Sequence, residues 1–292
     1  PVGETWPLQG TIQNLARSKS IVTVGLDAWD DLPVLALWMR RAVQRGAKLV
    51  VIGERNGLWR DTTAWLRGAP AAAVDALLDS LRAGAAPSSA PEVAAAVSAL
   101  NGQAPASLLV HPSLVASNRS RFEALAAALG ADGQTGLVGA PLLGANARGA
   151  ADLAPDLLRG DPERVLAARA LLVLGDEAWA ELKTGSFAHL VVATSQAVAE
   201  DDPRVDVVLP MAHAYERQGT ITNLEGRLQH QEGGAAPPPH ARADWGIAAG
   251  LAQRLGAPGP APTSLEVIRS LIADEHPALA AIIREEALIA RV

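Results

Sequence analysis

Two short aliphatic runs, separated by one amphipathic helical pattern, constrain the fold of this chain more than any other feature. The runs cover Ile21–Gly25 and Lys48–Ile52, and both have the length of a strand. Asp30 or Asp31 is expected to cap the helix between them, and Pro33 suits its first turn. Its apolar positions recur on one face, at Leu35, Trp38, Met39, Ala42 and Val43. Strand, helix and strand within about 33 residues predict a right-handed parallel crossover.

The second half of the chain repeats this pattern. Strands are predicted at Ala170–Gly175, His189–Ala193 and Val205–Leu209, with a helix at Ala178–Lys183. Pro210 is expected to stop the last strand, because proline cannot continue a central strand. The predicted fold class is therefore α/β, with two Rossmann-like lobes that contain parallel sheets and a helical C-terminal appendage.

Further elements complete the two lobes and the tail. Helices are predicted at Ala72–Arg82, Glu92–Leu100, Arg119–Leu129 and Trp245–Leu255, and a strand at Ser107–Val110. In the tail, Thr263 and Glu266 have the spacing of a capping box, and a last helix is expected at Ala278–Ile289. The expected division is a first lobe at 1–149, a second lobe at 150–256 and a helical tail at 257–292.

Composition excludes several classes of function. The chain contains no cysteine, which excludes disulfides, thiolate-held iron–sulfur clusters and cysteine zinc sites within these 292 residues. The net charge of −6 and the lack of a basic run argue against a nucleic-acid partner. No run approaches the roughly 18 apolar residues of a membrane span, so direct membrane insertion is not expected. The N-terminus resembles no signal peptide and begins at Pro1, so we expect a fragment of a longer polypeptide.

A polar segment follows the strand at Val205–Leu209. It contains Glu216, Asn223, Glu225 and Arg227, with glycines that permit tight turns. In open α/β sheets, segments that leave the carboxyl end of a strand line the binding crevice. The segment is thus expected to be a loop that holds a polar ligand or braces itself.

The motif in this segment resembles the signature of the molybdopterin oxidoreductase superfamily. It reads DVVLP followed by E-x-x-GT-x-TN-x-EGR-x-Q, up to Gln229. Three further segments resemble the family in the same order: Val22–Gly53, Gly144–Leu153 and Asp244–Gly256. Within the superfamily, the sequence looks most like the C-terminal part of the large iron–sulfur subunit of bacterial NADH–quinone oxidoreductase, respiratory complex I.

This resemblance implies a non-catalytic, structural portion of a subunit that supports electron transfer from NADH to quinone. Iron–sulfur clusters would lie in an N-terminal region outside this chain, and other peripheral-arm subunits of complex I would be the partners. The protein would be cytoplasmic and, through the complex, peripheral on the inner face of the cell membrane. An alternative is a fragment of a molybdopterin-dependent oxidoreductase, such as a formate dehydrogenase-like α subunit. A free-standing Rossmann-type binder of small molecules is a third possibility.

The resemblance also indicates candidate positions for cofactor contact, which we interpret as vestigial. They are Gly25, Asp27, Glu216, Asn223, Glu225 and Arg227. None of the strand-end loops reads G-x-G-x-x-G, so binding of NAD or FAD is not expected. A bound molybdopterin is possible but is the less favoured interpretation, and no cofactor is expected in this fragment. If the loop braces itself through a buried ion pair, Arg227→Ala should cost about 1–3 kcal/mol.

No other pattern in the sequence predicts a catalytic or metal site. The six histidines lack helical i, i+4 spacing, and no serine lies in a G-x-S-x-G elbow. Trp38, Trp59 and Trp65 are expected in the core or at a lobe interface, whereas Trp29 and Trp179 could line a crevice. We therefore expect no catalytic residue and no metal ligand in this chain.

Overall fold

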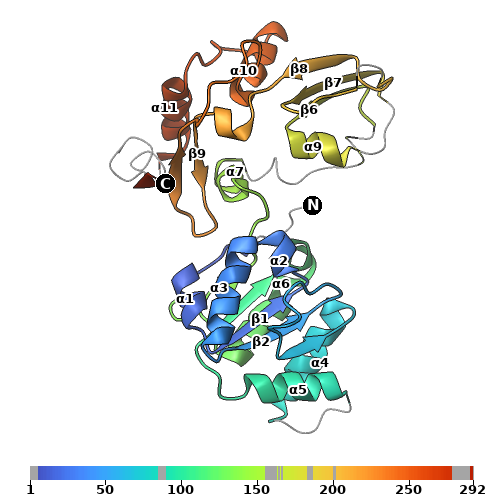
Figure 1. Ribbon diagram of the computed structural model, residues 1–292, viewed down its shortest axis with the longest axis vertical. Helices are drawn as coiled ribbons and strands as arrows, with labels where there is room; N and C mark the ends of the chain where they lie inside the picture. Colours follow the sequence, from blue (N-terminus) through green and yellow to red (C-terminus); the bar gives the residue numbers. More distant parts are fainter. Residues whose placement is uncertain are drawn as a thin grey trace. The chain divides into compact units, whose positions relative to one another are not determined.

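The computed structural model describes residues 6–84, 90–154, 163, 165, 167–182, 187–199, 202–277 and 290–291. Its contacts divide the chain into two units. Unit 1 is Pro1–Arg159 with Thr222–Arg227, and unit 2 is Gly160–Ile221 with Leu228–Val292. Figure 1 shows both units, with labels on many of their helices and strands. The three-part division expected from the sequence stays a prediction.

Unit 1 is built on a five-stranded parallel sheet. Its strands are β1 (Ser20–Val24), β2 (Lys48–Ile52), β3 (Ala64–Leu66), β4 (Ala106–Val110) and β5 (Val138–Gly139), in the spatial order β3-β2-β1-β4-β5. The predicted parallel pairing of the first two strands is confirmed, with Ser20 opposite Lys48 and Val24 opposite Ile52. Every residue of β1 and β4 is buried, because helices cover both faces of this sheet.

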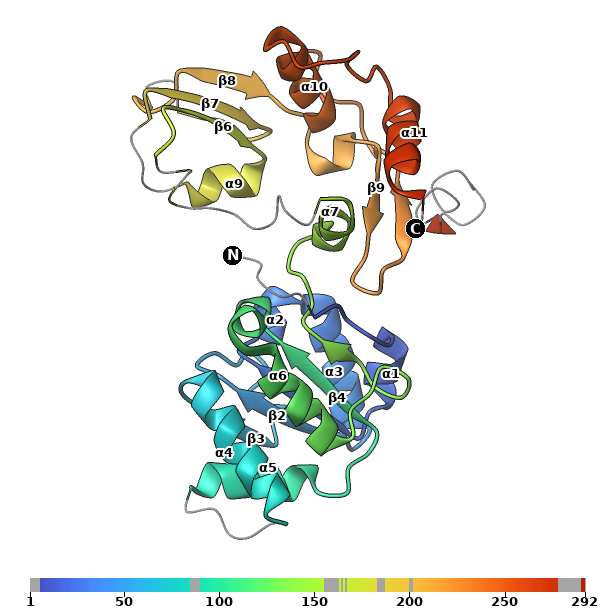
Figure 2. The ribbon, with the colours of Figure 1, turned by 180° about the vertical axis from the view of Figure 1, so that it is seen from behind.

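The two faces of the sheet carry two separate sets of helices. Helices α1 (Ile12–Arg17), α2 (Ala28–Asp31) and α3 (Pro33–Gln44) cover one face, and α4 (Pro70–Arg82), α5 (Pro91–Leu100) and α6 (Pro112–Leu129) cover the other (Figure 2). Ile21 packs with Leu35 and Met39 of α3 on the first face. Its neighbour Val22 packs with Phe122 of α6 on the opposite face, as the alternation of a strand requires. A last helix of this unit is α7 (Ala147–Leu153).

The start of α3 differs from the prediction. Neither Asp30 nor Asp31 caps it; both lie inside the short helix α2, which is capped by Asp27. Leu32 occupies the cap position of α3 without a side-chain hydrogen bond, and Pro33 is the first helical residue, as expected. The sequence contains several acidic residues before the helix, and only the backbone path decides which of them faces the free N–H groups.

Unit 2 contains a second parallel sheet and a smaller one. The strands β6 (Ala170–Leu174), β7 (His189–Thr194) and β8 (Val207–Pro210) form the first in that order. The other has the order β11-β10-β9, from β9 (Gly219–Thr222), β10 (Leu228–Gln231) and β11 (Ala290–Arg291). The helices of unit 2 are α9 (Asp176–Glu181), the 3-10 turn η1 (Ala214–Glu216), α10 (Asp244–Arg254) and α11 (Leu265–Glu275).

Three details of unit 2 differ from the sequence prediction. The polar segment expected as a loop forms β9 and β10, which are joined by a five-residue turn at 223–227. The cap of α11 is Ser264 rather than Thr263, and its hydroxyl accepts from the Val267 N–H at 3.4 Å. Pro210 is the last residue of β8, which lies at the edge of its sheet where proline is tolerated. The helix expected at 278–289 lies outside the described residues.

The predicted α/β class with parallel sheets is confirmed by both units. Within the part of the chain that the structure describes, no helix combines the length and apolar character needed to cross a bilayer.

Candidate functional site

The strand order of unit 1 places its topological switch point between β1 and β4, where open α/β sheets bind ligands. Gly25 leaves β1 at this point with a φ of +69°, which glycine adopts without strain. A side chain on Gly25 would meet the Leu114 Cδ1 at 2.5 Å and the His111 Cβ at 3.4 Å. The first turn of α6 therefore fills the space beside Gly25 with an apolar side chain.

Asp27 follows the switch point and is almost completely buried, with 7% of its surface exposed. Its Oδ1 accepts hydrogen bonds from the Gly57 N–H at 3.0 Å and the Trp29 N–H at 3.2 Å. Its Oδ2 lies 3.7 Å from the Arg55 Nε. The carboxylate thus takes one backbone donor at the start of α2 and one in the turn after β2, so neither donor is free for a phosphate oxygen.

The turn between β9 and β10 belongs to unit 1 and is braced by its own side chains. The Asn223 Oδ1 accepts from the backbone N–H groups of Glu225 and Arg227, at 3.0 and 2.9 Å. The Glu225 Oε1 accepts from the Ile12 N–H at 2.8 Å, at the start of α1. Gly226 has a φ of +78°, which completes the tight turn. Asn223 and Glu225 therefore make the contacts of a structural turn, while their expected role as former cofactor contacts stays a prediction.

Arg227 makes a weaker contact than expected. Its Nε lies 3.2 Å from the Glu225 Oε2, but 68% of the Arg227 side chain is exposed. An exposed ion pair contributes at most about 1 kcal/mol to stability. The larger cost expected for Arg227→Ala assumed a buried pair, and that assumption is wrong.

Glu216 lies in unit 2, apart from the other five candidate residues. Its Oε2 accepts from the His213 N–H at 2.8 Å and forms a capping box around η1. The structure therefore does not describe the six candidates as one cluster within a single unit. Gly25, Asp27, Asn223, Glu225 and Arg227 belong to unit 1: the first two follow β1, and the other three form part of the β9–β10 turn, where Asn223 lines a pocket with Asp31 and Leu32.

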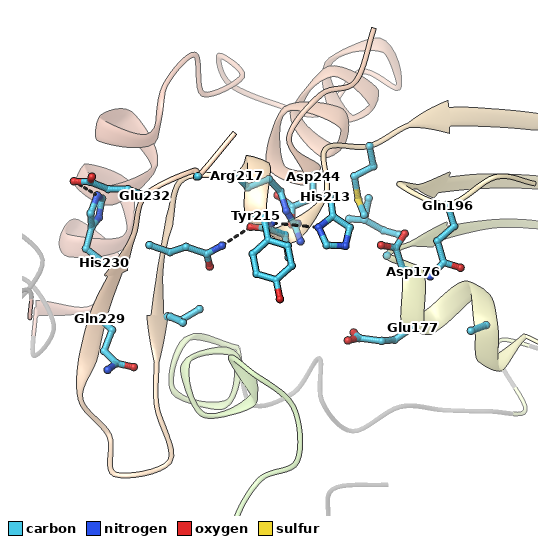
Figure 3. Close-up of a pocket in the computed structure, with 18 residues that line it drawn as sticks. Asp176, Glu177, Gln196, His213, Tyr215, Arg217, Gln229, His230, Glu232 and Asp244 are labelled. Atoms are coloured by element: carbon cyan, nitrogen blue, oxygen red, sulfur yellow. Dashed lines mark hydrogen bonds and ion pairs between the residues drawn. The ribbon is translucent and has the colours of Figure 1, made fainter. Parts of the chain in front are cut away.

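Unit 2 contains a large cavity that the sequence did not indicate, with a volume of about 1090 Å³. It opens beside the ends of β6 and β8 and beside the β9–β10 sheet. In Figure 3, Asp176 and Glu177 from α9 lie on one side, and Gln229 and His230 from β10 lie on the other. Tyr215 projects between them from η1 and is 75% exposed.

Asp176 is the most strongly held acidic side chain of this cavity. Its Oδ1 accepts from the Thr194 hydroxyl at 2.6 Å and the Ser195 N–H at 2.7 Å, and its Oδ2 accepts from the Ser195 hydroxyl at 2.6 Å. Partial burial acts to raise the pKa of Asp176, but these hydrogen bonds and the nearby His213 outweigh burial and lower it. Asp176 thereby joins the end of β6 to the end of β7 as an ionised acceptor.

The remaining charges of the cavity are mostly negative or paired. Arg217 is the one arginine among the described residues that line it, and the guanidinium forms an ion pair with Asp244. Glu177 and Glu232 add two exposed carboxylates. His230 faces Glu232 at 3.9 Å, which is at the limit of an ion pair. The described lining therefore offers acceptors and two imidazoles, and few free donors for an anionic group.

Two further expectations meet different outcomes. Trp59 is 60% exposed, so it does not lie in the core, and its alternative place at a lobe interface stays a prediction, whereas Trp38 and Trp65 pack partly buried against the α1–α3 face. Trp179 packs against the buried cluster beneath α9 and does not line the cavity.

Among the described residues, no group of three or more histidine, cysteine or acidic side chains could hold a metal ion.

Sequence reasoning missed Asp176, His213 and Arg217. One signal was present: Asp27 and Asp176 both follow the glycine that ends the first strand of a sheet, in the strings GLDAW and GDEAW. The structure shows that both carboxylates accept hydrogen bonds from a backbone N–H of the same unit. The class that the fold defines is thus an open α/β architecture with parallel sheets, in which a carboxylate of each unit accepts a hydrogen bond from a backbone N–H near the end of a strand.

Comparison with known families and relatives agrees with this architecture. The family model described as molybdopterin oxidoreductase matches residues 118–254. The assimilatory nitrate reductase catalytic subunit of Bacillus subtilis (strain 168) is 38% identical over 65 residues, which are 22% of this chain and 9% of the relative. A nitrate reductase of Klebsiella oxytoca is 35% identical over 89 residues, which are 30% of this chain and 8% of the relative. The matched segments span less than a tenth of the length of these curated relatives.

Solved structures share the fold at low sequence identity. The formyltransferase/hydrolase complex from Methylorubrum extorquens in complex with methylofuran aligns with a TM-score of 0.57 and 18% identity, over 85% of this chain and 78% of that chain. Acetylene hydratase from Pelobacter acetylenicus aligns with a TM-score of 0.56 and 15% identity, over 88% of this chain and 49% of that chain. The family match and the curated relatives thus show that residues 118–254, and shorter segments of the chain, are similar to molybdopterin oxidoreductases.

Proposed function

We propose that this chain is a scaffold portion of a molybdopterin-dependent oxidoreductase. The identity of the whole protein is supported by the family match at residues 118–254 and by two relatives that are nitrate reductases. The scaffold role is carried by one structural observation: the strand-end carboxylates Asp27 and Asp176 accept the hydrogen bonds that would otherwise be offered to a phosphate. The fold would position neighbouring parts of the polypeptide, and the groups that hold the cofactor would lie elsewhere.

The residues present do not fit the diphosphate of a pterin nucleotide. In unit 1, Leu114 fills the space beside Gly25, and the buried Asp27 would repel a phosphate. A diphosphate site instead needs free backbone N–H groups and unpaired cations. We therefore assign no step of the reaction to residues of this unit.

The cavity of unit 2 is spacious enough for a nucleotide, but its charges oppose one. Asp176, Glu177 and Glu232 would place carboxylates around the ligand, and Arg217 is already paired with Asp244. Like charges at close range in a partly desolvated cavity disfavour an anion. The strand-end position beside Gly175 is further occupied by the first residue of α9, which is itself acidic.

A second candidate is the large iron–sulfur subunit of NADH–quinone oxidoreductase that the motif resembles. The poor fit of both strand-end positions to a pterin nucleotide favours it, whereas the curated relatives favour the molybdopterin-dependent enzyme. In this candidate, iron–sulfur clusters would be carried outside this chain, and the partners would be peripheral-arm subunits at the cytoplasmic face of the inner membrane.

The metal and pterin content of the complete polypeptide decides between the two candidates. Elemental analysis for molybdenum and tungsten, with fluorescence detection of the oxidised pterin, would be made on protein purified from its own cells. The first candidate predicts about one metal and at least one pterin nucleotide per polypeptide. Iron and sulfide without pterin, together with copurifying peripheral-arm subunits, would contradict it and support the second candidate.

A further inference from the structure

Unit 1 carries a concentration of arginine side chains stacked on tryptophan rings. Four of its tryptophans have such a partner within residues 29–67. The distances from guanidinium carbon to ring centroid are 5.9 Å for Arg40 on Trp29, 5.2 Å for Arg41 on Trp38, 4.9 Å for Arg60 on Trp59 and 3.9 Å for Arg67 on Trp65. A guanidinium on an aromatic face is attracted to the ring and loses part of its conformational freedom before any ligand arrives.

These pairs lie around α3, the turn at 57–61 and the edge strand β3. The Arg40 Nε lies 3.0 Å from the Asp61 Oδ2, which ties α3 to the turn. Trp29 also packs against the turn, since a side chain on Gly57 would come within 2.5 Å of its Cβ. Trp65 of β3, like Trp38 of α3, packs against the cluster beneath the α1–α3 face. We call Trp29, Leu37, Arg41, Trp59, Arg60 and Arg67 the Arg–Trp surface.

The Arg–Trp surface is exposed and apolar at several points. The exposed fractions are 43% for Trp29, 56% for Leu37 and 60% for Trp59. Exposed large aromatic and aliphatic side chains of one folded unit indicate a place where another molecule docks. Tryptophan and arginine are also the residue types that dominate the binding energy of protein interfaces.

The surface is also basic within an acidic chain. Residues 29–68 contain seven Lys or Arg against four Asp or Glu, whereas the whole chain contains 25 basic and 31 acidic residues. Arg41, Arg60 and Arg67 are exposed, and none has an ion pair with another described residue. Of the nearby carboxylates, Asp61 is paired with Arg40 and Asp30 with Arg55, while Glu54 is exposed.

We propose that the Arg–Trp surface binds an acidic, amphipathic segment of a partner protein. Carboxylates of the partner would pair with Arg41, Arg60 and Arg67, whose planar guanidinium groups match a carboxylate in two-point contacts. Apolar side chains on the same segment would cover Leu37 and the Trp59 ring. A nucleic acid fits less well, because a phosphate backbone would leave the exposed Leu37 side chain uncovered, whereas the apolar side chains of an amphipathic segment cover it. This inference does not depend on the proposed function.

The test uses the full chain and a fluorescein-labelled helical peptide of about 18 residues with Glu on one face and Leu and Trp on the other. Binding is measured by fluorescence anisotropy at low and physiological salt, with a Lys-for-Glu peptide and a single-stranded oligonucleotide of matched length as further probes. The triple variant R41E, R60E and R67E removes the cations of the surface. The control variant R82E, R242E and R254E makes the same change in net charge at exposed arginines elsewhere.

The triple variant is expected to weaken binding of the acidic peptide by about 10- to 100-fold, and the control variant by less than about 3-fold. L37S is expected to weaken it by several-fold without changing its salt dependence. Melting curves of all variants should match the wild type, because the substituted side chains are exposed. Equal loss in both triple variants, no binding of the acidic peptide by the wild type, or tighter binding of the oligonucleotide would each overturn the proposal.

Discussion

Substitution of Asp176 by alanine tests how strongly one carboxylate stabilises the end of the second sheet. The carboxylate receives three hydrogen bonds from Thr194 and Ser195, at 2.6 to 2.7 Å. Hydrogen bonds to a charged group contribute about 1.5–3 kcal/mol each when buried. The Ser195 hydroxyl can return to water because Ser195 is only half-buried, whereas Thr194 is buried and its hydroxyl loses an acceptor, so we expect D176A to cost about 2–4 kcal/mol.

The effect of D176A should depend on pH in a defined direction. The folded-state pKa of Asp176 lies below its ordinary value of 3.8, so its stabilisation is fully present above that value. The stabilisation is lost as the pH falls through the folded-state pKa. The difference in stability between wild type and D176A should therefore be constant from about pH 5 to pH 8 and shrink below about pH 4.

Hydrogen exchange read by mass spectrometry is the appropriate assay, because it reports on unit 2 separately from unit 1. Peptides that cover β6 and β7 should lose protection in D176A by a factor that corresponds to about 2–4 kcal/mol. The control is E177A, since Glu177 is the next residue, is exposed and makes no hydrogen bond through its carboxylate to another described residue. Equal protection in D176A and E177A would refute the reasoning.

Three further substitutions test other parts of the structure by urea denaturation. D27A should destabilise unit 1 by about 2–3 kcal/mol, because two backbone N–H groups lose a buried acceptor. D30A, at an exposed carboxylate, should cost far less. Similar costs for the two variants would be inconsistent with the burial of Asp27. S107A should lower the free energy of unfolding by about 1–3 kcal/mol, since the buried Ser107 hydroxyl is hydrogen-bonded to the Ser18 hydroxyl and accepts from the Leu137 N–H. An unchanged midpoint of urea denaturation would count against this network. G246A should stabilise unit 2 by about 0.5–1 kcal/mol, because alanine favours a helix more than glycine does and Gly246 lies inside α10 with open space for a methyl group. A loss of stability would show that this space is filled.

The sequence predicted the regular elements because hydrophobic periodicity is a local property. The strand pattern around Ile21 and the helical stripe through Leu35 and Met39 were sufficient to predict a parallel crossover, and the structure contains it. Tight turns and caps were less predictable. Asp27 rather than Asp30 or Asp31 caps a helix, since the choice depends on a backbone path that no local pattern encodes.

The candidate site was less predictable than the fold because its geometry is set by residues far apart in the sequence. Gly25 was identified as a strand-end glycine, yet the filling of its crevice depends on Leu114, almost ninety positions later. The role of Asp176 likewise depends on hydroxyl groups of the next strand. The β9–β10 hairpin was expected as a loop, because its strands alternate weakly between polar and apolar residues.

Isothermal titration of the folded chain with guanosine diphosphate and inorganic pyrophosphate tests the central claim most directly. If Asp27, Leu114 and Asp176 occupy the strand-end positions, neither compound should bind with a Kd below about 1 mM. Saturable binding of either compound in the micromolar range, at one site per chain and weakened by salt, would contradict the account.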